Sequence, residues 1–223
     1  MKVNDLGYPK AEPNDIFQFN CSHCGDCCRN VKQAVPLNGL DLYRLMRYFK
    51  RPMEQIIEKY TEVVFIGDSN FPLMMLKTTH DDTCIFYKSG CSVQEAKPLP
   101  CRLYPYNIKP GNHDGLSYCI VSQKPHHYTG KTHRVGNWMR ENLTPDDRRY
   151  MIGWFSQALQ IGLLAMEICQ KPDGAAIYEQ LLARIIWLLY FYYEAGEDFW
   201  PQHERNMALL MDMLKSSAND RSQ

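Results

Sequence analysis

Eight of the nine cysteines in this chain of 223 residues follow one recognisable order. The first four form the pattern C-x2-C-x2-C-C, and the next four are separated by six, nine and seventeen residues. Free thiols oxidise and neighbouring thiolates repel one another, so such a dense set indicates a bound metal. The order predicts eight metal ligands: Cys21, Cys24, Cys27, Cys28, Cys84, Cys91, Cys101 and Cys119.

Disulfides explain these cysteines less well than a metal does. Disulfide frameworks belong to short secreted domains that cannot build a core, whereas 45% of these 223 residues are hydrophobic. The first residues lack the apolar run of a signal peptide, so we expect a cytoplasmic protein with reduced thiols. Nine cysteines also leave one unpaired in any disulfide scheme. A redox-active pair within the set stays open as the less favoured alternative.

The cysteine spacing favours an iron–sulfur cofactor over zinc by a small margin. Structural zinc usually takes two pairs of closely spaced ligands, but the second four cysteines here are spread out. The C-x2-C-x2-C run is similar to the one around a cubane [4Fe–4S] cluster in bacterial ferredoxins, although the later C-P is missing. Zinc stays open as the alternative cofactor.

The adjacent pair Cys27-Cys28 indicates two metal sites. Neighbouring side chains of an extended backbone point to opposite faces, so both thiols reach one ion only where the chain bends locally. Eight cysteines divide evenly into two iron–sulfur clusters with four ligands each. A single four-ligand site with several bystander thiols stays open as the alternative.

These cysteines and their neighbours resemble the YkgJ-type cysteine-cluster family, also called the CxxCxxCC family. The likeness covers about residues 17–120, with Lys97 standing where the family usually carries Arg. It implies a zinc- or iron-chelating domain, often labelled an iron–sulfur oxidoreductase. A relative of this type occurs in flagellin lysine methylases. The matching segments are 19–29, 83–87, 90–93, 97–106 and Cys119.

Two arginines, Arg29 and Arg102, directly follow predicted ligands. Their guanidinium groups could offset thiolate charge and donate hydrogen bonds to sulfur, which tunes the potential of a cluster. Placement on an ordinary surface is nearly as well supported by the sequence.

The segment 124–134 is the other candidate for cofactor binding. Its cationic and near-cationic side chains could hold an anion, and its histidines could hold a further metal. A solvated loop is the competing interpretation. The candidate residues are His126, His127, Lys131 and His133.

Charge and motifs exclude several functions. Lys and Arg number 25 and Asp and Glu also number 25, which argues against nucleic-acid binding. No run of 18 apolar residues is free of charge, so we expect no membrane span. The chain has no phosphate-binding glycine loop and no dinucleotide fingerprint, which disfavours nucleotide-driven and hydride-transfer enzymes.

The pattern of helix and strand signals predicts an α+β fold: a loop-rich metal domain at 1–125 and a helical domain at 126–223. We expect strands at 71–78 and 84–88, a long connection over 107–137, and a helix from Thr144 with an apolar stripe that includes Leu159, Met166 and a buried Cys169. Other helices are expected at 39–50, 53–60, 175–194 and 199–215.

The expected helix at 175–194 is apolar nearly all round, so it is buried in its own domain or against a partner, with a homodimer as the minority interpretation.

The sequence as a whole favours a two-cluster iron–sulfur protein that serves electron transfer or an uncharacterised redox reaction. The alternatives are a zinc-stabilised protein-interaction module and protein lysine methylation.

Overall fold

The structure is a computed structural model of the chain. It describes residues 8–19, 24–29, 31, 34–67, 70–111, 115–121 and 130–219. The chain forms two compact units: unit 1 is Met1–Val35 with Thr79–Phe155, and unit 2 is Pro36–Thr78 with Ser156–Gln223. Helices and short antiparallel strands alternate along the chain, which confirms the α+β fold. The boundary expected after residue 125 stays a prediction.

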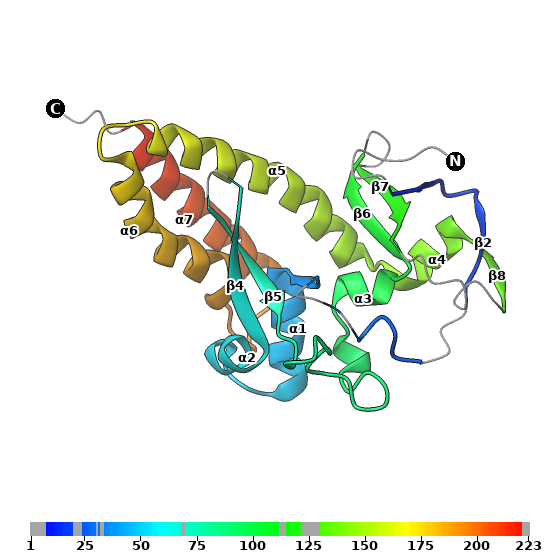
Figure 1. Cartoon of the computed structure of the whole chain (residues 1–223). Coiled ribbons are helices and arrows are strands. Elements are labelled where there is room, and N and C mark those ends of the chain that lie inside the picture. The colour runs from blue at the N-terminus through cyan, green and yellow to red at the C-terminus, as the bar shows by residue number, and fades with distance from the viewer. Residues whose placement is uncertain are drawn as a thin grey trace. The chain divides into compact units, whose positions relative to one another are not determined.

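Unit 1 is built on small antiparallel sheets, visible in green and blue in Figure 1. β6 (Tyr106–Pro110) and β7 (Leu116–Ile120) form a hairpin, and β1 (Lys10–Ala11) pairs with the other edge of β7. β2 (Ile16–Gln18) pairs with β8 (Thr132–Arg134), which leads into α4 (Val135–Asn142). The prediction of a long connection over 107–137 is therefore wrong. The strands in this range contain polar residues, so the sequence did not show a clear alternation of apolar and polar positions.

The core of unit 1 lies between this hairpin and two helices. α3 (Leu99–Leu103) and α4 pack onto one face of the hairpin, where Tyr106 and Ile108 of β6 and Leu116 and Tyr118 of β7 are buried. This core fixes the position of α3, which carries Cys101. Its buried members are Ala11, Leu99, Leu103, Tyr106, Ile108, Leu116, Tyr118, Val135, Met139 and Leu143.

Unit 2 begins with a three-stranded sheet and two helices. The sheet has the order β3 (Pro36–Leu37), β5 (Phe71–Leu76) and β4 (Thr61–Ile66), all antiparallel. α1 (Gly39–Phe49) starts with a capping box between Asn38 and Asp41, and α2 (Met53–Tyr60) follows it. The strand expected at 84–88 is wrong: that segment forms turns in unit 1, and β5 pairs with β3 and β4 instead.

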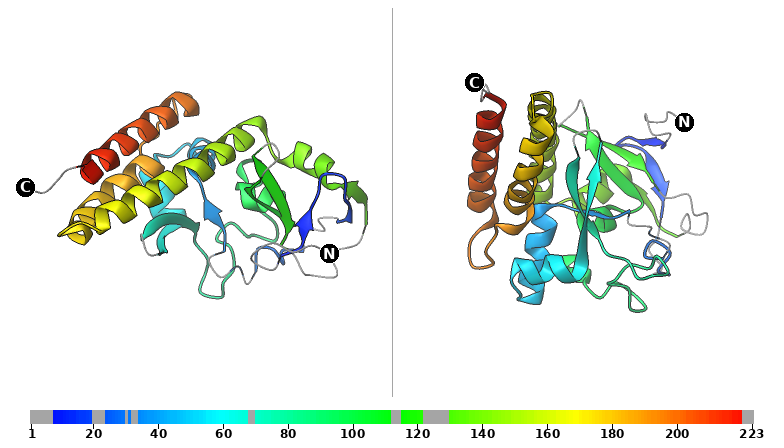
Figure 2. Two further views of the ribbon diagram at one scale, coloured as in Figure 1. Left: turned by 90° about the horizontal axis from the view of Figure 1, so that it is seen from above. Right: turned by 60° about the vertical axis from the view of Figure 1, so that its left-hand side comes forward.

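The remaining helices of unit 2 run side by side in both views of Figure 2. α6 (Gly174–Ile186) continues as a π-helical turn, η3 (Trp187–Phe191), and α7 (Phe199–Asn219) returns along it. Ile185, Leu188 and Tyr190 are fully buried, as the apolar sequence predicts, whereas Trp187 is 36% exposed. The Tyr190 hydroxyl donates to the carbonyl of Pro72 at 3.0 Å, so this turn packs against the sheet of its own unit.

α5 (Pro145–Cys169) begins in unit 1 and continues into unit 2. The buried residues of its second half are Ile161, Ala165 and Ile168. The predicted apolar stripe is wrong at Leu159, which is 64% exposed, and at Cys169, which is also exposed. The helix is apolar on more than one face, so composition alone did not identify the face that packs.

By length and composition α5 is also the one helix among the described residues that could cross a membrane, with 17% of its most apolar window buried. Core helices of soluble proteins pass the same test, so the finding carries little weight.

Candidate metal centre

A tight turn places Cys27 and Cys28 on the same side of the backbone. Gly25 begins the turn with φ of +79°, and its carbonyl accepts from the amides of Cys28 at 2.8 Å and Arg29 at 3.0 Å. Glycine adopts this left-handed conformation without a steric cost. The turn is the local bend that adjacent thiols need in order to share one ion.

The sulfur atoms of Cys27 and Cys28 are 3.8 Å apart. Two thiolates bound tetrahedrally to one ion, each at about 2.3 Å, lie about 3.8 Å from each other. The pair therefore already has the separation of two ligands on one metal ion.

A second segment brings two more thiols to this turn. The amide of Cys84 donates to the carbonyl of Cys28 at 2.7 Å, which ties the two segments together directly at the predicted ligands. Tyr87 then forms an isolated bridge with Cys91, and the amide of Ser92 donates to Phe86 at 2.9 Å. The chain thereby folds back, and Cys91 returns beside Cys84.

The fifth thiol of the group, Cys101, comes from α3. Burial raises its pKa, and the thiols of Cys84, Cys27 and Cys91 raise it further through charge repulsion. Burial likewise raises the pKa of Cys84, and Cys91 and Cys27 add to that effect. These mutual effects show that the four thiols lie close enough to interact electrostatically.

The pKa values of Cys27 and Cys28 shift in opposite directions. The hydrogen bond between the thiols lowers the pKa of Cys27 to about 6, with help from the positive charge of Lys97, while burial opposes the change. The same hydrogen bond raises the pKa of Cys28, and burial and the charges of Cys27, Cys84 and Cys101 raise it further. Five thiols thus form one interacting group, which we call the thiol cluster: Cys27, Cys28, Cys84, Cys91 and Cys101.

The donor set of the thiol cluster fits zinc or an iron–sulfur centre, since both take cysteine thiolates. Among the described residues, no three His, Cys, Asp or Glu side chains already stand close enough together to hold an ion. Thiols repel one another as they ionise, so an ion has to draw them the remaining distance.

The other predicted cysteine ligands are not part of the thiol cluster. Cys24 is half-buried and immediately precedes the Gly25 turn. Cys119 is buried on β7, with its sulfur 3.9 Å from the carbonyl oxygen of Asn107. Cys21 lies outside the described residues, as do His126 and His127. All of these stay predictions as ligands or cofactor contacts.

Both arginines that follow predicted ligands have defined partners. Arg29 donates to the hydroxyl of Tyr87 at 2.5 Å, and its guanidinium lies 4.9 Å from the centre of that ring. Arg102 forms two hydrogen bonds with the Asp147 carboxylate, at 2.8 and 2.9 Å, and also donates to the carbonyls of Lys97 and Asn142. Arg102 thus links α3 to the start of α5, and its predicted role toward sulfur stays a prediction.

His133 is surrounded by aromatic rings. Its Nε2 lies 3.2 Å from the hydroxyl of Tyr106, and its ring stacks on Trp138 with 4.9 Å between ring centres. Burial lowers its pKa. Lys131 is exposed, and its carbonyl accepts from the amide of Phe19 at 3.4 Å. The proposal that these side chains bind an anion or a metal stays a prediction.

Sequence reasoning missed a cavity beside the thiol cluster, within unit 1. It has a volume of about 340 Å³. Lys97, four residues before Cys101, lines this cavity and was not predicted as a site residue. The cavity is lined by Phe19, Cys27, Gln94, Lys97, Cys101, Arg102, Tyr104, Trp138 and Asn142.

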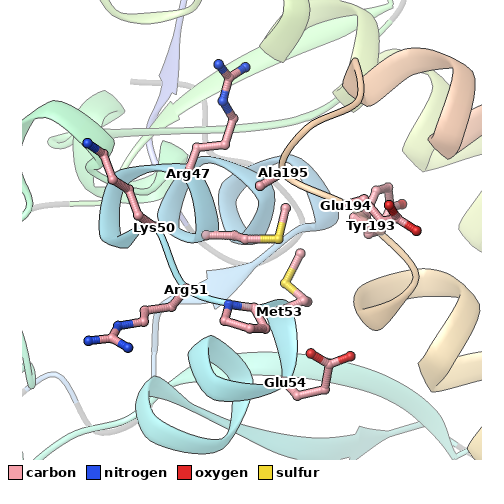
Figure 3. Close-up of a pocket in the computed structure, with 10 residues that line it drawn as sticks. Arg47, Lys50, Arg51, Met53, Glu54, Tyr193, Glu194 and Ala195 are labelled. Carbon is pink, nitrogen blue, oxygen red and sulfur yellow. The ribbon is translucent and has the colours of Figure 1, made fainter.

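A second cavity, of about 610 Å³, lies in unit 2 around the link between α1 and α2. Figure 3 shows Arg47, Lys50 and Arg51 pointing outward on one side, away from the cavity, with Glu54 and Glu194 on the other. Its lining contains no cysteine. It therefore offers no thiolate for a metal, and its charged groups do not converge.

Comparison with known proteins supports the metal centre. Residues 20–126 match the CxxCxxCC family model, described as "Putative zinc- or iron-chelating domain", which confirms the resemblance and supports metal binding. The chain is 28% identical over 99 residues to the uncharacterized protein MJ0661 of Methanocaldococcus jannaschii, across 42% of this chain and 48% of that protein. It thus spans about half the length of this curated relative. No solved structure matches.

Proposed function

From the CxxCxxCC domain over residues 20–126, we propose that this chain is an iron–sulfur protein that serves electron transfer or another redox reaction. The observation that carries the proposal is the thiol cluster, in which segments around residues 27, 84, 91 and 101 bring five thiols into one interacting group. When bound, the cluster would supply one-electron redox chemistry. The cavity beside Cys27 and Cys101 supports a reactive role, because a purely structural centre is usually closed.

The distance between Cys27 and Cys28 bears on the type of centre. In a cubane cluster four cysteines bind four irons, so each iron takes one cysteine, whereas each iron of a [2Fe–2S] centre takes two. Thiols 3.8 Å apart suit two ligands on one ion. We therefore favour a two-iron centre for the thiol cluster over the cubane cluster and over two separate clusters sharing this pair.

A zinc-stabilised interaction module is the second candidate. The separation of 3.8 Å fits a tetrahedral zinc site equally well. The exposed apolar residues of α5, Leu159 at 64% and Leu163 at 57%, favour a role in binding a partner or a second copy of the chain. Protein lysine methylation has no support among the described residues and stays a prediction.

Elemental analysis of protein purified without oxygen separates the two candidates. We expect brown protein with iron and acid-labile sulfide in equal amounts, bleached by air. Colourless protein with one zinc per chain, stable in air, would overturn the iron–sulfur proposal and support the second candidate.

Cysteine variants test which thiols hold the metal. Cys27→Ser and Cys28→Ser should each lower the metal content, because each removes a ligand of the same ion. Cys169→Ser is the matched control, since this thiol is exposed at the end of α5 in unit 2. Full metal content in both cluster variants would remove the pair from the ligand set.

A further inference from the structure

The cavity in unit 1 has one wall of aromatic rings. The ring of Phe19 meets Tyr104 edge-on with 5.8 Å between centres, and Trp138 edge-on with 5.4 Å. Trp138 is held in place because its indole nitrogen donates to the carbonyl of Leu103 at 3.2 Å. A wall of fixed rings binds flat, apolar ligands through dispersion and ring stacking.

Cys27 and Cys101 also line the cavity. Both thiols belong to the thiol cluster, so a ligand seated here lies directly beside the metal centre. A flat ligand in this position is placed for transfer of electrons to or from that centre.

Polar groups at the edge of the cavity can bind oxygen atoms. Lys97 is half-buried, and among the described residues its ammonium has no hydrogen-bonded partner. The side-chain amide of Gln94 also lines the cavity, as does that of Asn142, whose nitrogen donates to Trp138. The charge of Arg102 is already matched by Asp147. Lys97 is therefore the cation that a ligand would share with the thiols of Cys27 and Cys101.

We propose that this cavity binds a small quinone as the electron-transfer partner of the metal centre, with the ring between the aromatic wall and Cys27 and Cys101 and a carbonyl oxygen on Lys97. The inference rests on the proposed iron–sulfur function. A neutral ligand suits the site, because a thiolate-bound centre carries negative charge that would repel an anion. About 340 Å³ is ample for one benzoquinone or naphthoquinone ring.

The reaction balances with a one-electron carrier protein as the electron source. A centre held by these thiols would supply one electron at a time, the ammonium of Lys97 would stabilise the semiquinone anion, and the carrier would replace the electron. A second electron and two protons from water complete the hydroquinone. The carrier is oxidised twice for each quinone reduced.

Equilibrium dialysis with duroquinone tests binding without relying on turnover. Its four methyl groups block addition of thiols to the ring, so cysteines are not modified. We expect binding to the anaerobic, iron-loaded protein, and binding about tenfold weaker or more in Lys97→Met, which loses a charged hydrogen bond. Lys88→Met is the control, since Lys88 is an exposed lysine between Cys84 and Cys91.

Iron and sulfide content, measured on each sample, separates this inference from the proposed function. Iron–sulfur protein that fails to bind duroquinone, or that binds it equally after Lys97→Met, overturns the inference and leaves the function standing. Protein that holds only zinc overturns both. Dithionite-reduced protein whose absorption recovers on mixing with duroquinone, more slowly in Lys97→Met than in Lys88→Met, supports the inference.

Discussion

The ring of Tyr87 occupies the space where a side chain on Gly25 would begin: a Cβ built on Gly25 lies 2.5 Å from three of its atoms. Gly25 also has φ of +79°, which other residues adopt only with strain. Tyr87 is held in turn by Arg29, which donates to its hydroxyl. The turn that presents Cys27 and Cys28 thus depends on a glycine, a tyrosine and an arginine that bind no metal.

Gly25→Ala should therefore weaken metal binding although it removes no ligand. The left-handed conformation costs an alanine about 1–2 kcal/mol, and the contact with Tyr87 adds to that cost. We expect metal affinity to fall by about tenfold or more, measured by competition with a chelator. Gly196→Ala is the control, because a Cβ there meets nothing within 4 Å. Equal affinities in the two variants would show that the turn does not determine the geometry of the site.

The sequence was sufficient to predict several helix starts, whereas the predicted ligands stay a prediction. The Asn38 capping box and the Thr144 helix start both appear in the structure, because such signals act over three or four residues. Local signals also predicted the helix at Met53–Tyr60 to the residue.

Features that depend on distant residues were not predicted. β5 pairs with β3 and β4, which the sequence did not indicate, because strand pairing depends on long-range packing. The position of the Cys27-Cys28 pair also escaped prediction. The prediction of two metal sites started from an extended backbone at this pair, whereas Gly25 forms a turn. The turn requires glycine because of Tyr87, which lies 62 positions further along the chain.

The ion pair between Arg102 and Asp147 should contribute strongly to the stability of unit 1. Asp147 is 1% exposed and Arg102 19%, so Arg102→Met leaves a buried carboxylate without its cation. We expect a loss of about 3–5 kcal/mol in the free energy of unfolding, measured by urea denaturation. Arg140→Met, at an exposed arginine of α4, should change it by no more than about 0.5 kcal/mol. A loss of similar size in the control would show that the charge pair is not responsible.

Tyr190→Phe tests the packing of the π-helical turn in unit 2. The Tyr190 hydroxyl is buried and donates to the Pro72 carbonyl, so its removal deletes a buried hydrogen bond. We expect a loss of about 1–3 kcal/mol in the free energy of unfolding, with metal content unchanged. Tyr48→Phe is the control, because Tyr48 is 39% exposed. A fall in metal content would show that the substitution also disturbs the metal centre.

His133 should make the protein less stable in mild acid. Burial among aromatic rings lowers its pKa in the folded state, so as pH falls the unfolded chain takes up the proton first. The stability contributed by the neutral ring is therefore present above a pH of about 6.5 and is lost as pH falls toward the lowered folded pKa.

We expect the melting temperature to fall from pH 7.5 to pH 5.5, and to fall less in His133→Gln. His80→Gln is the control, since the His80 side chain is 99% exposed and should leave the pH dependence unchanged. The comparison is made on metal-free protein, so that release of metal in acid does not contribute. An identical pH dependence in wild type and His133→Gln would show that His133 is not the group responsible.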